Sequence, residues 1–81
     1  MADIRLLIIS PEETLLDTAV DAVTLPGSVS PFEVLPGHAP IISSLEKGRI
    51  TWRAGAEEGS LSIASGFVEV KDNQVLAAVE Q

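Results

Sequence analysis

The 81-residue chain has no cysteine and no tyrosine, and its aromatic side chains are limited to two phenylalanines and one tryptophan. Without cysteine, neither a disulfide nor a thiolate metal site is available to stabilise the fold. A domain of this size buries only about 60% of the surface that its unfolded chain exposes. We therefore expect stability to come from a core of Val, Ile, Leu and Ala and from contact with a partner. The lack of cysteine also fits a reducing compartment.

Positive charge is scarce as well, because five Lys and Arg residues stand against twelve Asp and Glu residues, a net charge of −7. Nucleic-acid binding requires a basic face, and anionic lipid surfaces attract basic segments. We therefore expect no nucleic-acid partner and no direct lipid insertion. The acidic residues are spread along the chain, which is typical of a solvated surface.

Long apolar runs are missing too. No stretch approaches the ~20 residues of a membrane-spanning helix, and the N-terminus lacks the basic and apolar regions of a signal peptide. The composition, 46% hydrophobic and 21% charged, is typical of a folded domain. We expect residues 1–81 to form a single domain that stays in the cytoplasm.

The motifs of common catalytic sites are also absent. There is no G-x-S-x-G around a serine and no G-x-x-x-x-G-K-[ST] loop for phosphate. A single histidine, His38, cannot build a usual zinc site. Twelve carboxylates could supply acid–base pairs, but no two are singled out by their positions. We therefore expect no catalytic residue, no cofactor and no metal.

The stretch Thr24–Leu45 contains four of the five prolines and carries the triplet Leu-Pro-Gly twice, at 25–27 and at 35–37. Pro fixes φ and Gly permits positive φ, so Pro-Gly favours a turn. Two such turns predict an extended segment over 30–34. A further strand is predicted over Ile41–Leu45, since Pro40 disfavours helix in the residue before it.

The remaining segments are short and alternate between apolar and polar residues, with turn residues between them. This pattern predicts an all-β fold, a small flattened β-sandwich or barrel of about 8–10 short strands. Asp72-Asn73 is predicted as a tight turn, and residues 54–59 as a hairpin loop. The predicted strands of this group cover 4–9, 49–53, 61–65, 67–70 and 75–79.

Residues 11–23 fit two interpretations. Ser10 and Glu13 are placed as the cap and third residue of a helix, and apolar residues then recur at helical spacing. Alternatively, Leu16, Thr18 and Val20 lie on one face of a strand, with a one-residue bulge before Val23 shifting the alternation. Local rules do not decide between helix and strand.

Two polar residues also allow two interpretations. Lys71 lies beside the predicted Asp72-Asn73 turn, and an acidic β domain with an exposed hairpin lysine resembles a biotinyl or lipoyl carrier domain. The simpler interpretation is an ordinary hairpin lysine, because the sequence around Lys71 differs from that of carriers. His38 is either a pH-sensitive contact or a ring that bonds a nearby carbonyl and fixes its loop.

Several motifs together resemble the N-terminal domain of the epsilon subunit of the F-type ATP synthase. They are TLPG at 24–27, F-x-VLPGHAP at 32–40 and GFVEV at 66–70, with Asp72-Asn73 following. The family usually has glycine where Ser30 and Glu33 stand here. The resemblance implies strands with a bulge over 11–23, so we predict strand there.

The resemblance further implies a non-catalytic rotor subunit of the central stalk that couples c-ring rotation through gamma to ATP synthesis. Its expected partners are the gamma subunit and the c-ring, at the cytoplasmic face of the bacterial plasma membrane, without homo-oligomerisation. Most family members continue into two C-terminal helices that can inhibit hydrolysis or bind ATP. We expect no such helical domain, inhibition or nucleotide site here. The predicted interface with the c-ring and gamma comprises Ser28, Val29, Ser30, Pro31, Phe32, Gly37, His38, Ala39 and Pro40.

Overall fold

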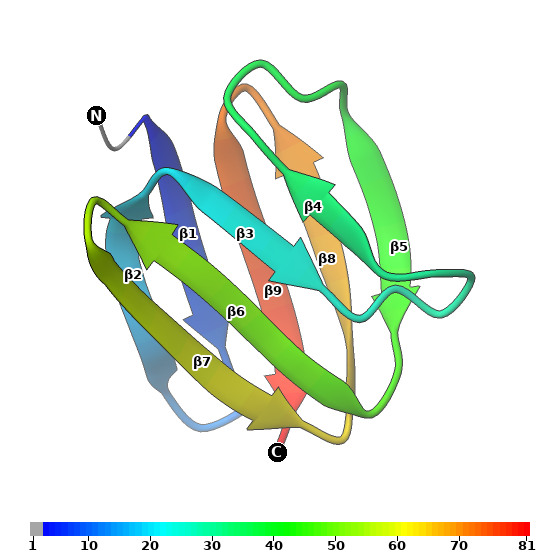
Figure 1. Cartoon of the computed structure of the whole chain (residues 1–81). Coiled ribbons are helices and arrows are strands. Elements are labelled where there is room, and N and C mark those ends of the chain that lie inside the picture. The colour runs from blue at the N-terminus through cyan, green and yellow to red at the C-terminus, as the bar shows by residue number, and fades with distance from the viewer. Residues whose placement is uncertain (1–2) are drawn as a thin grey trace.

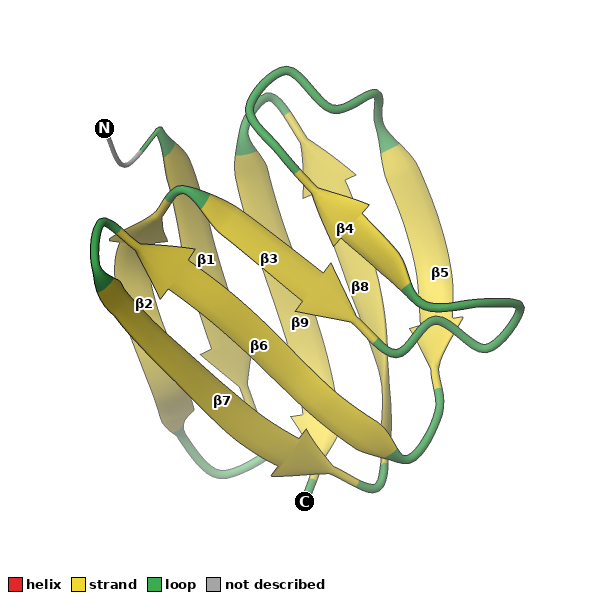
Figure 2. Ribbon diagram, in the orientation of Figure 1, coloured by secondary structure: helices red, strands yellow, loops and turns green. Residues whose placement is uncertain are grey.

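Nine β-strands make up the regular secondary structure of the described residues, 3–81, in the computed structural model (Figures 1 and 2). Their number and the lack of helix over these residues confirm the all-β prediction. The strands are β1 Ile4–Ile9, β2 Thr14–Val20, β3 Ala22–Leu25, β4 Phe32–Val34, β5 Ile41–Leu45, β6 Gly48–Ala54, β7 Glu57–Ile63, β8 Ser65–Lys71 and β9 Gln74–Glu80.

The strands form two sheets that face each other across one core (Figure 1). The five-stranded sheet has the order β2-β1-β9-β8-β5, and the four-stranded sheet has the order β4-β3-β6-β7. The strand pairs are antiparallel except β1 with β9, which run parallel. The predicted sandwich is therefore confirmed.

The core follows from the alternation of side chains along each strand. In β9, for example, Val75, Ala77 and Val79 are buried while the residues between them are exposed. No polar or charged residue is buried among residues 3–81. The buried hydrophobic residues are Ile4, Leu6, Ile8, Val20, Ala22, Val23, Leu25, Val34, Leu45, Ile50, Ile63, Val68, Val70, Val75, Ala77 and Val79.

Within residues 11–23, residues 14–20 and 22–23 form strand and none forms helix, so the interpretation based on local capping signals is wrong and the predicted strand is confirmed. The capping residues instead close the β1–β2 turn, where the N–H of Glu13 donates to Ser10 Oγ at 3.2 Å and the N–H of Ser10 donates to the Glu13 carbonyl at 2.8 Å. The same short-range polar bonds that cap a helix also stabilise a turn.

The bulge lies elsewhere than predicted. The pairing of β1 with β2 shifts by one residue between Ile8 and Ile9, opposite Leu15. The change of alternation before Val23 has a different cause, because the chain leaves the five-stranded sheet at Asp21 and enters the four-stranded sheet. Ala22 and Val23 are both buried at this corner.

The two Leu-Pro-Gly triplets behave differently. Gly37 has φ +83° and the N–H of His38 donates to the Leu35 carbonyl at 3.1 Å, which confirms a turn there. Gly27 does not have positive φ but forms a bridge with Leu45 of the other sheet. The prediction of a turn at 26–27 is wrong, and the chain turns at 28–30 instead.

One of the two hairpin predictions is confirmed, and the other gives too long a loop. Asp72 and Asn73, with φ of 51° and 60°, form the tight turn predicted for them, and positive φ at both residues is typical of a type I′ hairpin. The predicted loop over 54–59 is too long, since only Gly55 and Ala56 form the turn and β7 begins at Glu57.

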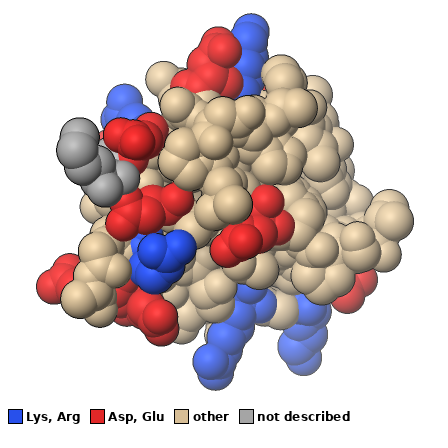
Figure 3. Space-filling model, turned by 45° about the horizontal axis from the view of Figure 1, so that its top comes forward, with Lys and Arg blue, Asp and Glu red and all other residues tan. Residues whose placement is uncertain are grey.

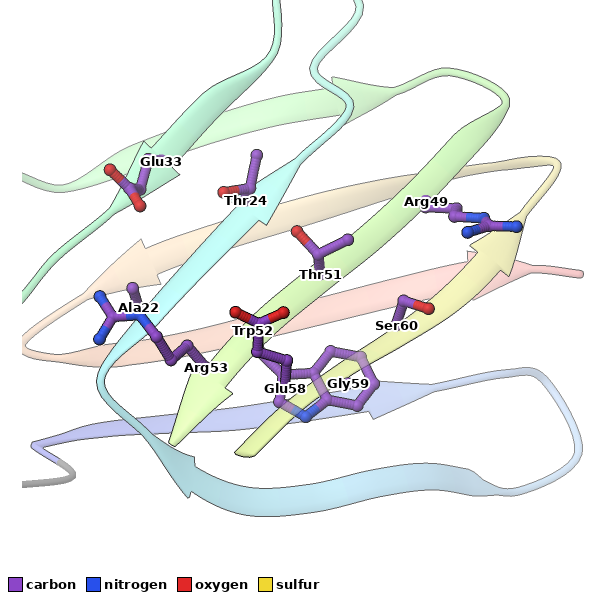
Figure 4. A pocket seen from close by; sticks show the side chains of 10 residues that line it. All are labelled: Ala22, Thr24, Glu33, Arg49, Thr51, Trp52, Arg53, Glu58, Gly59 and Ser60. Atoms are coloured by element: carbon purple, nitrogen blue, oxygen red, sulfur yellow. The ribbon is translucent and has the colours of Figure 1, made fainter. Parts of the chain in front are cut away.

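Trp52 explains why a glycine interrupts β7. Gly59 is the cross-strand partner of Trp52, and a Cβ on Gly59 would clash with the indole ring. Figure 4 shows the indole beside β7 at this residue. The half-buried ring thus occupies the space that a side chain on Gly59 would need.

We predict that Gly59→Ala destabilises the domain by about 1–3 kcal/mol, because the indole must leave its place. In a domain of this size, 1 kcal/mol corresponds to roughly 4–8 °C in Tm. Thermal unfolding followed by circular dichroism measures the effect. Ser60→Ala, an exposed change in the same strand, is the control, and equal Tm values for the two variants would contradict this packing account.

Asp21 ties the corner between β2 and β3 to the β6–β7 hairpin. Its Oδ2 accepts the N–H of Gly55 at 2.7 Å, and its own N–H donates to the Arg53 carbonyl at 2.7 Å. The hydrogen bond from Gly55 holds the pKa of Asp21 below its usual value of 3.8. The ionised carboxylate is therefore favoured in the folded state.

A lowered pKa makes this contribution to stability depend on pH. It is fully present above the unfolded pKa, about 3.8, and is lost as the pH falls through the lower folded pKa. We predict that Asp21→Asn is less stable than wild type at pH 7 and that the difference shrinks below about pH 4. Urea unfolding at several pH values measures it, and a difference independent of pH would contradict the assignment.

Candidate functional site

The nine predicted interface residues lie in two loops at opposite ends of the edge strands β4 and β5. The β3–β4 loop holds Ser28, Val29, Ser30 and Pro31, with Phe32 opening β4. The β4–β5 loop holds the other four. In Figure 1 the first loop projects at the right and the second lies at the top. The length of β5 separates them by about 13 Å, so they flank one edge of the sandwich rather than form one cluster.

The β3–β4 loop has a firmly held base and an exposed apolar tip. The N–H of Ser28 donates to the Ser44 carbonyl at 3.0 Å, while Phe32 packs against the core. A Cβ on Gly27 would lie 3.0 Å from the Phe32 ring, so the base of the loop is tightly packed. Val29, by contrast, is 99% exposed. An apolar side chain so fully exposed on an anchored loop is suited to contact with a partner.

The β4–β5 loop is fixed by hydrogen bonds to its own backbone and to a distant turn. His38 Nδ1 donates to the Ala39 carbonyl at 2.7 Å, and the N–H of Gly37 donates to Asn73 Oδ1 at 2.7 Å. The interpretation of His38 as a ring that bonds a nearby carbonyl is confirmed. Leu35 and the residues from Ala39 to Pro40 are exposed.

Neither loop carries formal charge, since residues 28–32 and 35–40 contain no Asp, Glu, Lys or Arg. In Figure 3 the acidic side chains crowd the left of the view, whereas much of the upper right shows no charged atoms. In a chain with net charge −7, the two loops thus differ from the rest of the surface in carrying no charged side chain. They can dock against an apolar or neutral surface without desolvating a charge.

A second apolar surface, not predicted from the sequence, lies on the outer face of the five-stranded sheet. Phe67 and Ile42 are 65% and 77% exposed. Leu7 lies beside Leu76, and Ala78 lies between Ile9 and Phe67. We call these six residues the outer apolar face. A signal was present in the sequence, because Ile4–Ile9, apart from Arg5, and Phe67-Val68 are apolar on both faces of their strands.

A shallow depression and an ion pair border the outer apolar face. Pro11, Ser65, Phe67 and Ala78 are among the residues that line the depression. At the far end of β1, Arg5 donates from Nε and Nη2 to the two carboxylate oxygens of Asp17 at 3.1 and 2.9 Å. These bonds lower the pKa of Asp17, but an exposed pair of this kind contributes little to stability.

The outer face of the four-stranded sheet is polar. Figure 4 shows its open pocket, which side chains from all four strands line, among them Thr24, Glu33, Thr51 and Arg53. No group of three or more His, Cys, Asp or Glu residues that could hold a metal occurs among residues 3–81. Over the same residues, the structure contains no helix that could span a membrane.

The polar outer face of the four-stranded sheet contrasts with the outer apolar face of the five-stranded sheet.

Lys71 is exposed at the end of β8, directly before the Asp72–Asn73 turn. Its position at a hairpin tip is as predicted. Lys71 is paired with Gln74 across the hairpin, and its neighbour Asn73 accepts the hydrogen bonds from Gly37 and Arg5.

Comparison with known proteins assigns the family. The model of the β-sandwich domain of the ATP synthase Delta/Epsilon chain matches residues 3–81. An ATP synthase epsilon chain of Syntrophotalea carbinolica is 36% identical over 77 residues, which are 95% of this chain and 56% of that protein. The epsilon chain of Leptospira borgpetersenii is 43% identical over 84% of this chain and 54% of its own length. The chain thus spans little more than half the length of these curated relatives.

Solved structures agree with the sequence comparisons. A chain in the cryo-EM structure of Euglena gracilis mitochondrial ATP synthase, containing OSCP, F1 and the c-ring, superposes with a TM-score of 0.92 and 25% identity. The alignment covers all of this chain and 52% of that one. A chain from the central stalk and c-ring of the Tetrahymena thermophila enzyme shares the fold, with a TM-score of 0.80 and 15% identity. The chain belongs to the family of the β-sandwich domain of the ATP synthase delta/epsilon chain.

Proposed function

We propose that the chain is a non-catalytic central-stalk component of an F-type ATP synthase, which couples c-ring rotation through gamma to ATP synthesis. The observation that carries the proposal is the family match over residues 3–81. Relatives named epsilon chain come from bacteria, which supports a place at the cytoplasmic face of the bacterial plasma membrane. The proposal concerns the sandwich alone and assigns it no inhibitory role.

To transmit torque, the domain must be stiff and must contact two other subunits, but it needs no reactive group. The sandwich supplies stiffness because each strand is hydrogen-bonded to at least one neighbour across a shared core. The accessible surface is 4865 Å². Two interfaces of standard size, each taking about 800 Å² from the domain, would engage about a third of it.

The two surfaces described above supply the contacts. We assign the c-ring contact to the nine predicted residues of the uncharged loops, led by Val29 and His38. We assign the gamma contact to the outer face of the five-stranded sheet, because it exposes Ile42 and Phe67 whereas the outer face of the other sheet is polar. A few side chains buried at the centre of an interface carry most of its binding free energy, and exposed aromatic residues such as Phe67 are enriched there.

For the c-ring contact, we predict that Val29→Asp reduces ATP-driven proton pumping while leaving the Tm of the isolated chain nearly unchanged. A carboxylate forced against a neutral surface costs about 2 kcal/mol or more, which weakens binding more than about tenfold. Epsilon-depleted membranes reconstituted with each variant provide the measurement.

Ala56→Asp is the matched control for Val29→Asp, since Ala56 is an exposed turn residue of the β6–β7 hairpin, away from both loops (Figure 1). It introduces the same charge and should pump like wild type. If both variants pump equally well, the loop is not a rotor contact.

For the gamma contact, we predict that Phe67→Asp abolishes co-purification of the chain with gamma. The exposed ring contributes little to the folded state of the isolated chain, so its Tm should fall by no more than a few degrees. Pull-down with tagged chain measures the association, and Ala56→Asp again serves as the control. Retention of gamma by Phe67→Asp would remove the outer apolar face from the interface.

A further inference from the structure

Asn73 connects three segments that are far apart in the sequence. Its backbone carbonyl accepts the N–H of Arg5 at 2.9 Å, which holds the start of β1. Its side-chain Oδ1 accepts the N–H of Gly37 at 2.7 Å, across 36 residues. Asn73 itself lies in the β8–β9 turn with φ +60°, a region that Asn tolerates better than most residues.

The β4–β5 loop depends on this contact for its attachment to the sandwich. Its other hydrogen bonds described above are local, from His38 N–H to Leu35 and from His38 Nδ1 to Ala39. Pro36 and Pro40 have no N–H to donate. The loop also lies outside the strand pairing that orders β4 and β5.

The direction of the Gly37 N–H explains why a distant acceptor is needed. Pro at the second position and Gly with φ +83° at the third are typical of a type II turn. The turn bond is made by His38, one residue later. The Gly37 amide is therefore left for a partner outside the turn, and Asn73 provides it.

We propose that Asn73 is a positioning residue for the partner-binding loop Leu35–Pro40, which it holds in its docking conformation through the Gly37 amide. The docking part of this inference rests on the proposed function. A loop that is ordered before binding loses less conformational entropy when it binds. The same contact ties the loop to the β8–β9 hairpin and β1, so force on the loop passes into the five-stranded sheet.

Two substitutions at Asn73 separate the side chain from the backbone. Asn73→Gly keeps the left-handed conformation accessible but removes the acceptor, whereas Asn73→Asp keeps both. Asp72→Gly is the matched control, since Asp72 occupies the same turn with φ +51°, whereas the acceptor of the Gly37 N–H is Asn73. Like Asn73→Gly, it places a glycine in the β8–β9 turn, so the two variants should change the stability of the hairpin by similar amounts.

The first measurement is amide hydrogen exchange at Gly37 in the isolated 81-residue chain, followed by NMR. We expect Asn73→Gly to accelerate exchange about tenfold, because protection by one hydrogen bond is lost. Asn73→Asp and Asp72→Gly should exchange like wild type. Unchanged exchange in Asn73→Gly would overturn the positioning role.

The second measurement is binding of the same variants to epsilon-depleted ATP synthase. We expect Asn73→Gly to bind about three- to tenfold more weakly, since the loop must now be ordered on binding, and Asn73→Asp to restore affinity. Faster Gly37 exchange with unaltered affinity would overturn the docking part of the inference. Failure of the wild-type chain to bind would refute the proposed function, while the exchange measurement would still decide whether Asn73 fixes the loop.

Discussion

The parallel pairing of the first strand, β1, with the last, β9, is the contact on which the fold depends. It joins the β1–β2 hairpin to the β9-β8-β5 group, so that five strands become one sheet. Leu6 and Ile8 of β1 are fully buried where the two groups meet. Such a pairing between chain ends has a high loop-closure cost, and it is offset by burial of apolar side chains rather than by a disulfide.

Closing the core in this way uses one face of each sheet and leaves two outer faces with opposite character. The four-stranded sheet is polar outside, as expected of a sheet that faces water. The five-stranded sheet instead exposes Phe67 and Ile42, and the uncharged loops border its β5 edge. A small domain that exposes apolar side chains on one sheet and two uncharged loops beside it is better suited to be held between other subunits than to act alone.

The sequence predicted the strands well because alternation is local and reports which residues face the core. It failed where the same local signal serves two structures, as at Ser10 and Glu13, whose cap-like bonds close a turn. Gly27 was misassigned because its partner, Leu45, lies in the other sheet.

The candidate site was predicted less completely than the fold. The resemblance indicated the two loops, but their separation along β5 and their attachment through Asn73 are tertiary features that no local pattern encodes. The outer apolar face was missed for a related reason. Apolar residues on both faces of Ile4–Ile9, interrupted only by Arg5, indicate that both faces of the strand are covered, but they do not show which neighbouring strands extend the apolar surface.

The central claim is that this sandwich is a mechanical coupler, held by its surfaces within a rotor. The most direct test is to add the purified 81-residue chain to epsilon-depleted F-type ATP synthase in membranes and to measure ATP-driven proton pumping. The account predicts that the chain binds stoichiometrically and restores pumping. Pumping that stays at the depleted level, with the chain left unbound, would contradict it.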